Sequence, residues 1–321
     1  MRNPRYFRTL LLRTPLFFLL HSASALAQND LEPNLDAQSL NGKSHANAES
    51  LYPYAPKRTE GKLPSTHTHQ AYTFVGITDK GVVRPKNEDS FWVDAQAPVF
   101  LVADGMGGHE AGEIASGLAS MIIRDWSLAT WSQAISNLLP YARTMWVSAA
   151  FHVANQAIYA RSAQHSTRRG MGTTAVAAVL TPTGADIINL GDSRAYLVKD
   201  QQIQQISHDH SLLQKYIDEG VLRTKEEIEA FPYKNIITQA MGTQPNIIPD
   251  IFPVKLAPND QILLCSDGLT NELSEREIAQ ILNQNASLKE KAQTLVQEAK
   301  TRGARDNVTA VIIQIEAPSK P

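Results

Sequence analysis

The stretch VADGMGGHEAGEIAS, residues 102–116, sets an acid and a glycine cluster between an apolar run and a segment of helical character. The apolar run begins at Val99 and stops at Asp104, and the glycines that follow are Gly105, Gly107 and Gly108. Such a turn suits a phosphate-binding loop, a metal site or a simple strand-to-helix connection. The rest of the chain has to decide between these three interpretations.

The familiar glycine-rich phosphate loops do not match this turn. A P-loop needs a lysine after its second glycine, and GMGGHEAG contains none. The dinucleotide fingerprint requires a glycine spacing that this cluster lacks, and an EF-hand requires Asp or Asn at alternate positions. The chain also has no G-x-S-x-G motif for a serine nucleophile. The glycines are therefore not expected to cradle phosphate.

Acidic residues recur where strand-like runs end or begin. A single aspartate at a strand end is a common turn former. Five such acidic positions are harder to dismiss, because strands in facing sheets would bring their ends to one cleft. These positions are Asp104 after VFLVA, Asp192 after IINLG, Asp267 after ILLCS, Asp306 before NVTAVIIQI, and the pair Glu88-Asp89 before SFWV.

Converging carboxylates call for bound cations, since without them they would repel and protonate. The set is all oxygen, without paired His or Cys, which favours Mg²⁺ or Mn²⁺ over zinc. Two such ions could hold a bridging hydroxide at neutral pH and orient it for in-line attack. Arg84 lies four residues before Glu88, and its planar fork suits two phosphate oxygens. The pattern predicts metal-assisted hydrolysis of a phosphate ester.

Composition agrees with a soluble globular protein. The 321 residues are 43% hydrophobic and 19% charged, with a formal net charge of -2. This balance gives no electrostatic footprint for nucleic acid. The single cysteine, Cys265, excludes an intrachain disulfide and a Cys-rich zinc site. Its place in the apolar run QILLCSDG predicts a small buried hydrophobic residue rather than a reactive thiol.

The N-terminal region is predicted to lie outside the folded domain. Residues 1–27 combine a basic start, an uncharged stretch with an apolar centre, and an Ala-Leu-Ala end, as in a secretory signal peptide. Residues 28–70 are rich in Asn, Ser, His, Pro and Gln, and we expect a disordered linker. The folded domain is predicted to span residues 71–317, with a tail at 318–321.

The folded part is predicted to be α+β, an antiparallel sheet covered by helices. Short β-branched runs are joined by turn signals such as TPTG and GDSR, which favours antiparallel meanders. The strand-like runs are AYTFVGI, SFWVDA, PVFLVAD, TTAVAAVL, ADIINLGD, RAYLVK, QILLCSD and DNVTAVIIQI. Helices are predicted over 110–126, 141–162 and 274–300, with Met145 and Tyr159 on the apolar stripe of the second.

The order of the motifs resembles that of the type 2C, metal-dependent Ser/Thr protein phosphatases (the PPM family), and most of all the bacterial branch. The resemblance covers residues 71 to about 316. The motifs that carry it are GITDKGVVRPKNEDS, VADGMGGHEAGEIAS, GMGTTAVAAVL, INLGDSRAYLV, HDHSLLQKYIDEG, CSDGLTNEL and RDNVTAVII. The resemblance implies a four-layer α-β-β-α fold, an antiparallel β-sandwich flanked by helix pairs, with metals in the cleft at one end. It further implies that residues 208–246 form a flap that borders the cleft and influences substrate choice.

The resemblance also assigns roles to individual residues. Two core Mn²⁺ or Mg²⁺ ions are implied, with a third that is held more weakly. Arg84 would bind the substrate phosphate. Asp104 would bridge both core ions, with the Gly105 carbonyl as another ligand. Asp267 and Asp306 would complete the first ion. Glu88 would serve the second ion through a side-chain or water contact, with Asp89 in the outer shell, and Asp192 would bind the third.

Two positions depart from the family pattern. Eukaryotic members carry a histidine after the Asp-Gly, proposed as the general acid, whereas this chain has Met106. We do not transfer that role to His109, and a metal-bound water is the expected proton donor. Asn271 stands where many members have aspartate, so the third ion is expected to bind more weakly.

The predicted function is hydrolysis of phosphoserine and phosphothreonine in proteins by a metal-bridged hydroxide. Phosphorylated Ser/Thr proteins, a cognate Ser/Thr kinase and its substrates are the expected partners, and a monomer is expected. The alternative is a catalytically inactive homologue that binds phosphoproteins, but such homologues lose core acids that are present here. The signal peptide indicates a periplasmic or secreted protein, whereas the family default is the cytoplasm.

Overall fold

The structure is a computed structural model that describes residues 58–63, 71–95, 97–107, 111–132, 140–164 and 170–317. All of them lie in one unit of the chain, Glu49–Pro321. The predicted export signal, the tail and most of the predicted linker fall outside the described residues. Among the helices in the described part, none combines the length and apolar character needed to cross a bilayer.

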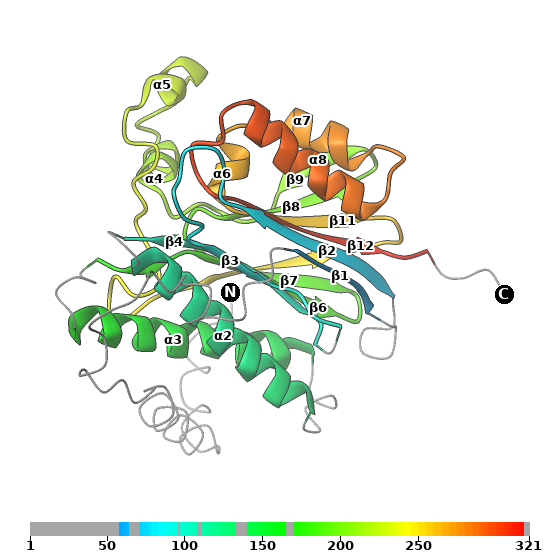
Figure 1. Cartoon of the computed structure of the whole chain (residues 1–321), viewed down its shortest axis with the longest axis horizontal. Helices are drawn as coiled ribbons and strands as arrows, with labels where there is room; N and C mark the ends of the chain where they lie inside the picture. The colour runs from blue at the N-terminus through cyan, green and yellow to red at the C-terminus, as the bar shows by residue number, and fades with distance from the viewer. Residues whose placement is uncertain are drawn as a thin grey trace, which may run out of the picture. The chain divides into compact units, whose positions relative to one another are not determined.

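Two antiparallel sheets of six strands each form the centre of the described unit (Figure 1). In the first sheet the strand order is β1 (Arg58–Leu63), β2 (Tyr72–Asp79), β12 (Val308–Ile315), β11 (Gln261–Cys265), β8 (Arg194–Lys199) and β9 (Gln202–Gln205). In the second it is β10 (Asp250–Lys255), β7 (Gly184–Leu190), β6 (Ala175–Thr181), β4 (Val99–Met106) and β3 (Asp89–Trp92), with β5 (Gly172–Thr173) beside β4. Each of the eight predicted runs contains a strand, and the antiparallel pairing is confirmed.

Side chains of the central strands alternate between two layers of core. On β4, Phe100 and Val102 pack between the sheets, whereas Val99 and Leu101 pack under the helices. Phe74 on β2 meets Phe100 edge-to-face across the sandwich, with ring centroids 5.1 Å apart. This alternation is the period of two that a sandwiched strand requires.

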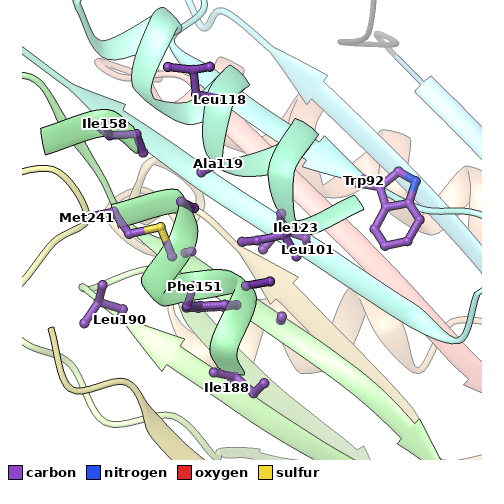
Figure 2. Packing of buried hydrophobic residues seen from close by; sticks show 14 of the residues in the cluster. Trp92, Leu101, Leu118, Ala119, Ile123, Phe151, Ile158, Ile188, Leu190 and Met241 are labelled. Atoms are coloured by element: carbon purple, nitrogen blue, oxygen red, sulfur yellow. The ribbon is translucent and has the colours of Figure 1, made fainter. Parts of the chain in front are cut away.

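Two long helices, α2 (Ala111–Ser132) and α3 (Pro140–Gln164), cover the second sheet. Figure 2 shows Ile123 of α2 close to Leu101 of β4, and Leu118 and Ala119 of α2 belong to the same buried cluster, as does Phe151 of α3. The predicted face of α3 is wrong. Met145 and Tyr159 are 46% and 40% exposed, while its buried apolar side chains are Val147, Ala150, Phe151, Ala154 and Ile158. Apolar residues occur all round this helix, so its contacts with α2 and the sheet decide which face is covered.

The first sheet is covered by α7 (Glu275–Leu282) and α8 (Leu288–Thr301), with the short α6 (Asp267–Thr270) after β11. The single helix predicted over 274–300 is therefore two. Ser287 is the N-cap of α8, and its capping box with Glu290 satisfies backbone N–H groups at the start of the helix. This local motif begins a new helix within the segment that was predicted to be one. Cys265 is fully buried as predicted, and burial raises its thiol pKa to about 12.

Residues 58–63 correct the predicted linker, since β1 pairs with β2 along its whole length. The segment RTEGKL has no hydrophobic period, so its strand conformation comes from the backbone groups of the β2 edge. Between β9 and β10, residues 208–246 include the short helices α4 (Leu212–Asp218) and α5 (Lys225–Ala230). Figure 1 shows α5 standing away from the sheets.

Candidate active site

Antiparallel pairing brings the predicted acids to one end of the sandwich. Asp89 at the start of β3 stands opposite Asp104 near the end of β4. Asp267 follows the end of β11, and Asp306 precedes the start of β12, its antiparallel partner. The negative charges of Asp89, Asp267, Asp192 and Asp306 all act on Asp104. The predicted convergence is therefore present in the described structure.

Asp104 is held by the backbone and hydroxyl groups of the neighbouring strand. Its N–H donates to Thr174 Oγ1 at 3.0 Å, and its carbonyl accepts from Thr174 N and Thr173 Oγ1, both at 2.9 Å. Burial raises the pKa of its carboxyl well above the usual range, and the charge of Asp89 raises it further. These hydrogen bonds fix the backbone of Asp104. A cation nearby would stabilise the charged form of its carboxyl.

Asp89 is buried, with 5% of its surface exposed. Its Oδ2 accepts hydrogen bonds from Ser266 Oγ at 2.7 Å and Thr309 Oγ1 at 2.6 Å. Its Oδ1 is buried and has no hydrogen-bond partner within the described part of the chain. Burial raises the pKa of Asp89 to about 7, although the two hydroxyl donors oppose that change.

Asp267 and Asp306 are brought together by Gly268. A Cβ at Gly268 would lie 1.9 Å from the carbonyl oxygen of Asn307, so only glycine permits this approach. Asp267 Oδ2 accepts from Asn271 Nδ2 at 3.1 Å, and none of the described residues hydrogen-bonds its buried Oδ1. Burial raises the pKa of Asp267, and the charge of Asp306 adds to the effect.

Glu88 and the Gly105 carbonyl meet at the start of α2. A Cβ at Gly112 would lie 2.8 Å from the Gly105 carbonyl oxygen and 2.9 Å from Glu88 Oε2. Both oxygens therefore border the same small space, as the predicted second-ion site requires. Burial raises the pKa of Glu88, while the charge of Arg84 lowers it.

Asp192 lies just beyond β7, after Gly191, whose φ of +111° is one that L side chains rarely adopt. Burial raises the pKa of Asp192 to about 7, and the charges of Asp267 and Asp209 contribute. Asp209 was not among the predicted site residues. It is paired by Arg194, whose Nε and Nη2 donate to Asp209 Oδ2 at 2.9 and 2.7 Å. Asp209 is thus hydrogen-bonded to Arg194, whereas the same guanidinium acts on Asp192 only through its charge, and no ion pair to Asp192 is found among the described residues.

Arg84 extends from the turn after β2 to the acidic cluster. Its Nη2 lies 2.7 Å from Asp306 Oδ2, and the two side chains are 47% and 32% exposed. A guanidinium at the rim of the cluster is open to solvent and to a substrate phosphate. Met106 is part of β4 and supplies no proton, and His109 lies outside the described residues.

The donor chemistry of the cluster fits hard divalent cations. Two buried carboxylate oxygens have no hydrogen-bond partner among the residues that the structure describes, and several carboxyls have a raised pKa. Bound cations would satisfy both. The described side chains do not, in this arrangement, place three or more His, Cys, Asp or Glu groups around one ion. One reason is that Asp306 Oδ2 accepts a hydrogen bond from Arg84 in this arrangement. Another is that the Gly105 ligand would be a backbone carbonyl rather than a side chain.

Sequence reasoning missed the residues that support the cluster. Thr174, Ser266, Thr309 and Asn307 donate to the site residues or accept from them, but none carries a charge that would reveal it. Each lies within a quoted motif, but only Ser266 and Asn307 directly adjoin a predicted ligand, Asp267 and Asp306 respectively. Thr174 and Thr309 have apolar or hydroxyl neighbours, so the sequence offered no comparable signal for them.

The fold and the acidic cluster identify the class of protein. A family model described as Protein phosphatase 2C matches residues 85–308. The chain belongs to this family and is a protein phosphatase, as the order of its motifs predicts.

Particular relatives are bacterial. The chain is 35% identical over 246 residues to the "Serine/threonine phosphatase stp" of Listeria monocytogenes, covering 76% of this chain and 96% of the relative. The crystal structure of the Mycobacterium tuberculosis serine/threonine phosphatase PstP/Ppp is similar, with a TM-score of 0.69 and 32% identity, over 77% of this chain and 99% of that one. The PstP catalytic domain in complex with 2 manganese ions gives a TM-score of 0.67 and 31% identity, over the same shares.

Proposed function

We propose that this protein hydrolyses phosphoserine and phosphothreonine in proteins, using two core Mn²⁺ or Mg²⁺ ions and a third, more weakly held ion. The Listeria and Mycobacterium relatives are serine/threonine phosphatases, which supports the choice of substrate. The PstP catalytic domain is known in complex with 2 manganese ions, which supports the choice of metal.

One observation carries the proposal. Asp89, Asp104, Asp192 and Asp267 come from four separate segments, yet burial raises the pKa of each. Negative charge in the site adds to the effect, since Asp267 acts on Asp89, Asp104 and Asp192, and Asp306 acts on Asp267. Folding that gathers so much uncompensated negative charge is costly unless cations join it. A purely structural role for these acids would instead show them paired, as Asp209 is with Arg194.

The site residues would have two kinds of role in the reaction, metal binding and phosphate binding. Asp104 would hold both core ions, with Asp267 and Asp306 completing the first. Glu88 would serve the second, with the Gly105 carbonyl as a further ligand beside it and Asp89 in the outer shell. When bound, such ions supply an attacking hydroxide at neutral pH and neutralise the phosphate charge. Arg84 would bind two phosphate oxygens and orient the ester for in-line attack. Asp192 would hold the third ion, and Asn271 beside Asp267 adds no charge to that ion.

The proposal extends to the domain and its partners. Residues 71–317 would form the phosphatase domain, with residues 208–246 bordering the cleft and influencing which phosphoproteins bind. We propose a monomeric enzyme that acts on the products of a Ser/Thr kinase.

The test is hydrolysis by the purified full chain. We expect turnover of p-nitrophenyl phosphate and of phosphothreonine peptides with Mn²⁺, and loss of both in chelator. Asp267→Asn should remove most turnover, whereas Asp200→Asn, at an exposed turn with φ of 49°, should retain it. Wild-type rates in Asp267→Asn would disprove the metal assignment. Phosphopeptide binding without turnover in the wild type would favour the inactive homologue.

A further inference from the structure

We propose that Asn307 is the positioning residue that holds the loop bearing Arg84 and Glu88 against the Asp306 edge. The inference rests on the proposed function for the roles of Arg84, Glu88 and Asp306. On this inference, one uncharged side chain fixes the position of the phosphate-binding Arg84 relative to the metal ligands Glu88 and Asp306.

The side chain of Asn307 is buried, 3% exposed, and uses all of its principal hydrogen-bonding groups on this loop. Its Nδ2 donates to the carbonyls of Lys80 at 3.0 Å and Lys86 at 2.8 Å. Its Oδ1 accepts from the Glu88 N–H at 2.7 Å. One amide nitrogen thus joins both ends of the segment that contains Arg84, and the amide oxygen fixes the backbone of Glu88.

The same residue is tied to Asp306 through its own backbone. The Asn307 N–H donates to Asp306 Oδ1 at 2.9 Å, which orients that carboxyl. The loop lies close against the strand entry. A Cβ at Gly81 would lie 2.2 Å from the Asp306 carbonyl, and Val82 N donates to the Ala304 carbonyl at 3.1 Å.

The ion pair between Arg84 and Asp306 is too exposed to order this loop by itself. Pairs of such exposure contribute little to stability, since water screens the charges and both side chains lose rotamer freedom. The side-chain hydrogen bonds of Asn307 are shielded from water and therefore determine the position of the loop. Arg84 is then presented from a backbone that is ordered before substrate arrives.

The chain offers a matched control in Asn155 on α3. This asparagine is 1% exposed, accepts from Gly242 N at 2.8 Å, and donates to the carbonyls of Gln244 at 3.0 Å and Pro245 at 3.2 Å. It makes the same three bonds to a different loop. Asn307→Ala and Asn155→Ala should therefore lower the melting temperature of the full chain to similar extents.

The two variants should differ in metal binding and in KM. By calorimetric titration with Mn²⁺, Asn307→Ala should bind roughly 10- to 100-fold more weakly, as for other residues that orient metal ligands. Asn155→Ala should bind within about twofold of wild type. With p-nitrophenyl phosphate at saturating Mn²⁺, only Asn307→Ala should raise KM. In an Arg84→Ala background it should raise KM no further, because its effect on phosphate passes through Arg84.

The outcomes separate this inference from the proposed function. Mn²⁺ affinity and KM for Asn307→Ala that match those of Asn155→Ala would overturn the positioning role. Additive effects of Arg84→Ala and Asn307→Ala on KM would also count against it. A wild-type chain that binds Mn²⁺ but hydrolyses no phosphate ester would defeat the proposed function, while the titration would still report on Asn307. If Asn307→Ala does not fold by circular dichroism, Asn307→Ser and Asn155→Ser provide the same comparison.

Discussion

Replacing Gly268 with alanine is a sharp test of how closely the acids must approach. The new Cβ would lie 1.9 Å from the Asn307 carbonyl oxygen, whereas ordinary van der Waals contact begins at 3.4 Å. Both atoms belong to rigid segments, so the start of α6 and the entry to β12 must separate by about 1.5 Å. That movement would carry Asp267 away from Asp306.

The magnitudes predict a larger effect on activity than on stability. In a helix, Gly→Ala usually stabilises by about 0.5–1 kcal/mol, but overpacking costs about 1–3 kcal/mol. We therefore expect a net loss of about 1–2 kcal/mol in the free energy of unfolding. Metal ligands tolerate errors of only about 0.2 Å, and misplacement by about 1 Å in an active site can cost about 100-fold in rate. We expect kcat/KM to fall by about that factor.

The assay is denaturant unfolding in chelator, followed by p-nitrophenyl phosphate kinetics at saturating Mn²⁺. Gly220→Ala is the control, because its φ of +67° should cost about 1–2 kcal/mol, while the nearest atoms to its Cβ are Arg223 side-chain atoms at 3.6 Å and beyond. It should lose stability and keep its turnover per folded molecule. Near-wild-type kcat/KM in Gly268→Ala would refute the reasoning that this contact sets the distance between the two acids.

Three further outcomes are expected. Arg84→Ala should raise KM for p-nitrophenyl phosphate by roughly 10- to 100-fold, the value of a charge-assisted hydrogen bond; an unchanged KM in steady-state assays would exclude a phosphate contact. Thr309→Val removes the 2.6 Å donor to Asp89 Oδ2, so the pKa of Asp89, already raised to about 7, should rise further, which a carboxyl NMR titration in chelator would detect or exclude. Because burial raises the folded-state pKa values of Asp89 and Asp192 to about 7 from 3.8, these groups stabilise the metal-free chain most below pH 3.8, and this contribution is lost as pH rises through about 7. Thermal unfolding should therefore show a larger gain from Mn²⁺ over chelator at about pH 8 than at about pH 5, and an equal gain would argue against proton release on metal binding.

Local pattern identified the eight predicted strands, but it missed β1, β9 and β10 and did not give the helix faces. The strand runs were readable because β-branched alternation has a period of two and each run ends at a turn residue. The α3 face was predicted wrongly, because its apolar residues surround the helix and only its neighbours select the buried side. The break between α7 and α8 lies at Ser287, where a capping box outweighs the helical character on either side.

The sequence by itself determined which acids exist and where strands stop beside them. Asp104, Asp267 and Asp306 follow or precede apolar runs, and their charge makes them visible without any knowledge of the fold. Their number and their all-oxygen chemistry were enough to predict a divalent metal site and a phosphate-ester substrate. The strand order could not be read in this way, since pairing depends on contacts between distant segments.

Only the tertiary structure decided which uncharged groups hold those acids. Asn307 reaches Lys80, Lys86 and Glu88, all more than 200 residues earlier in the chain, and Thr309 reaches Asp89 from a similar distance. The β1 strand likewise exists because the β2 edge offers backbone partners to a segment without a pattern of its own. Charge and periodicity are local properties of a chain, whereas a hydrogen bond between distant segments becomes specific only after the sheets have closed.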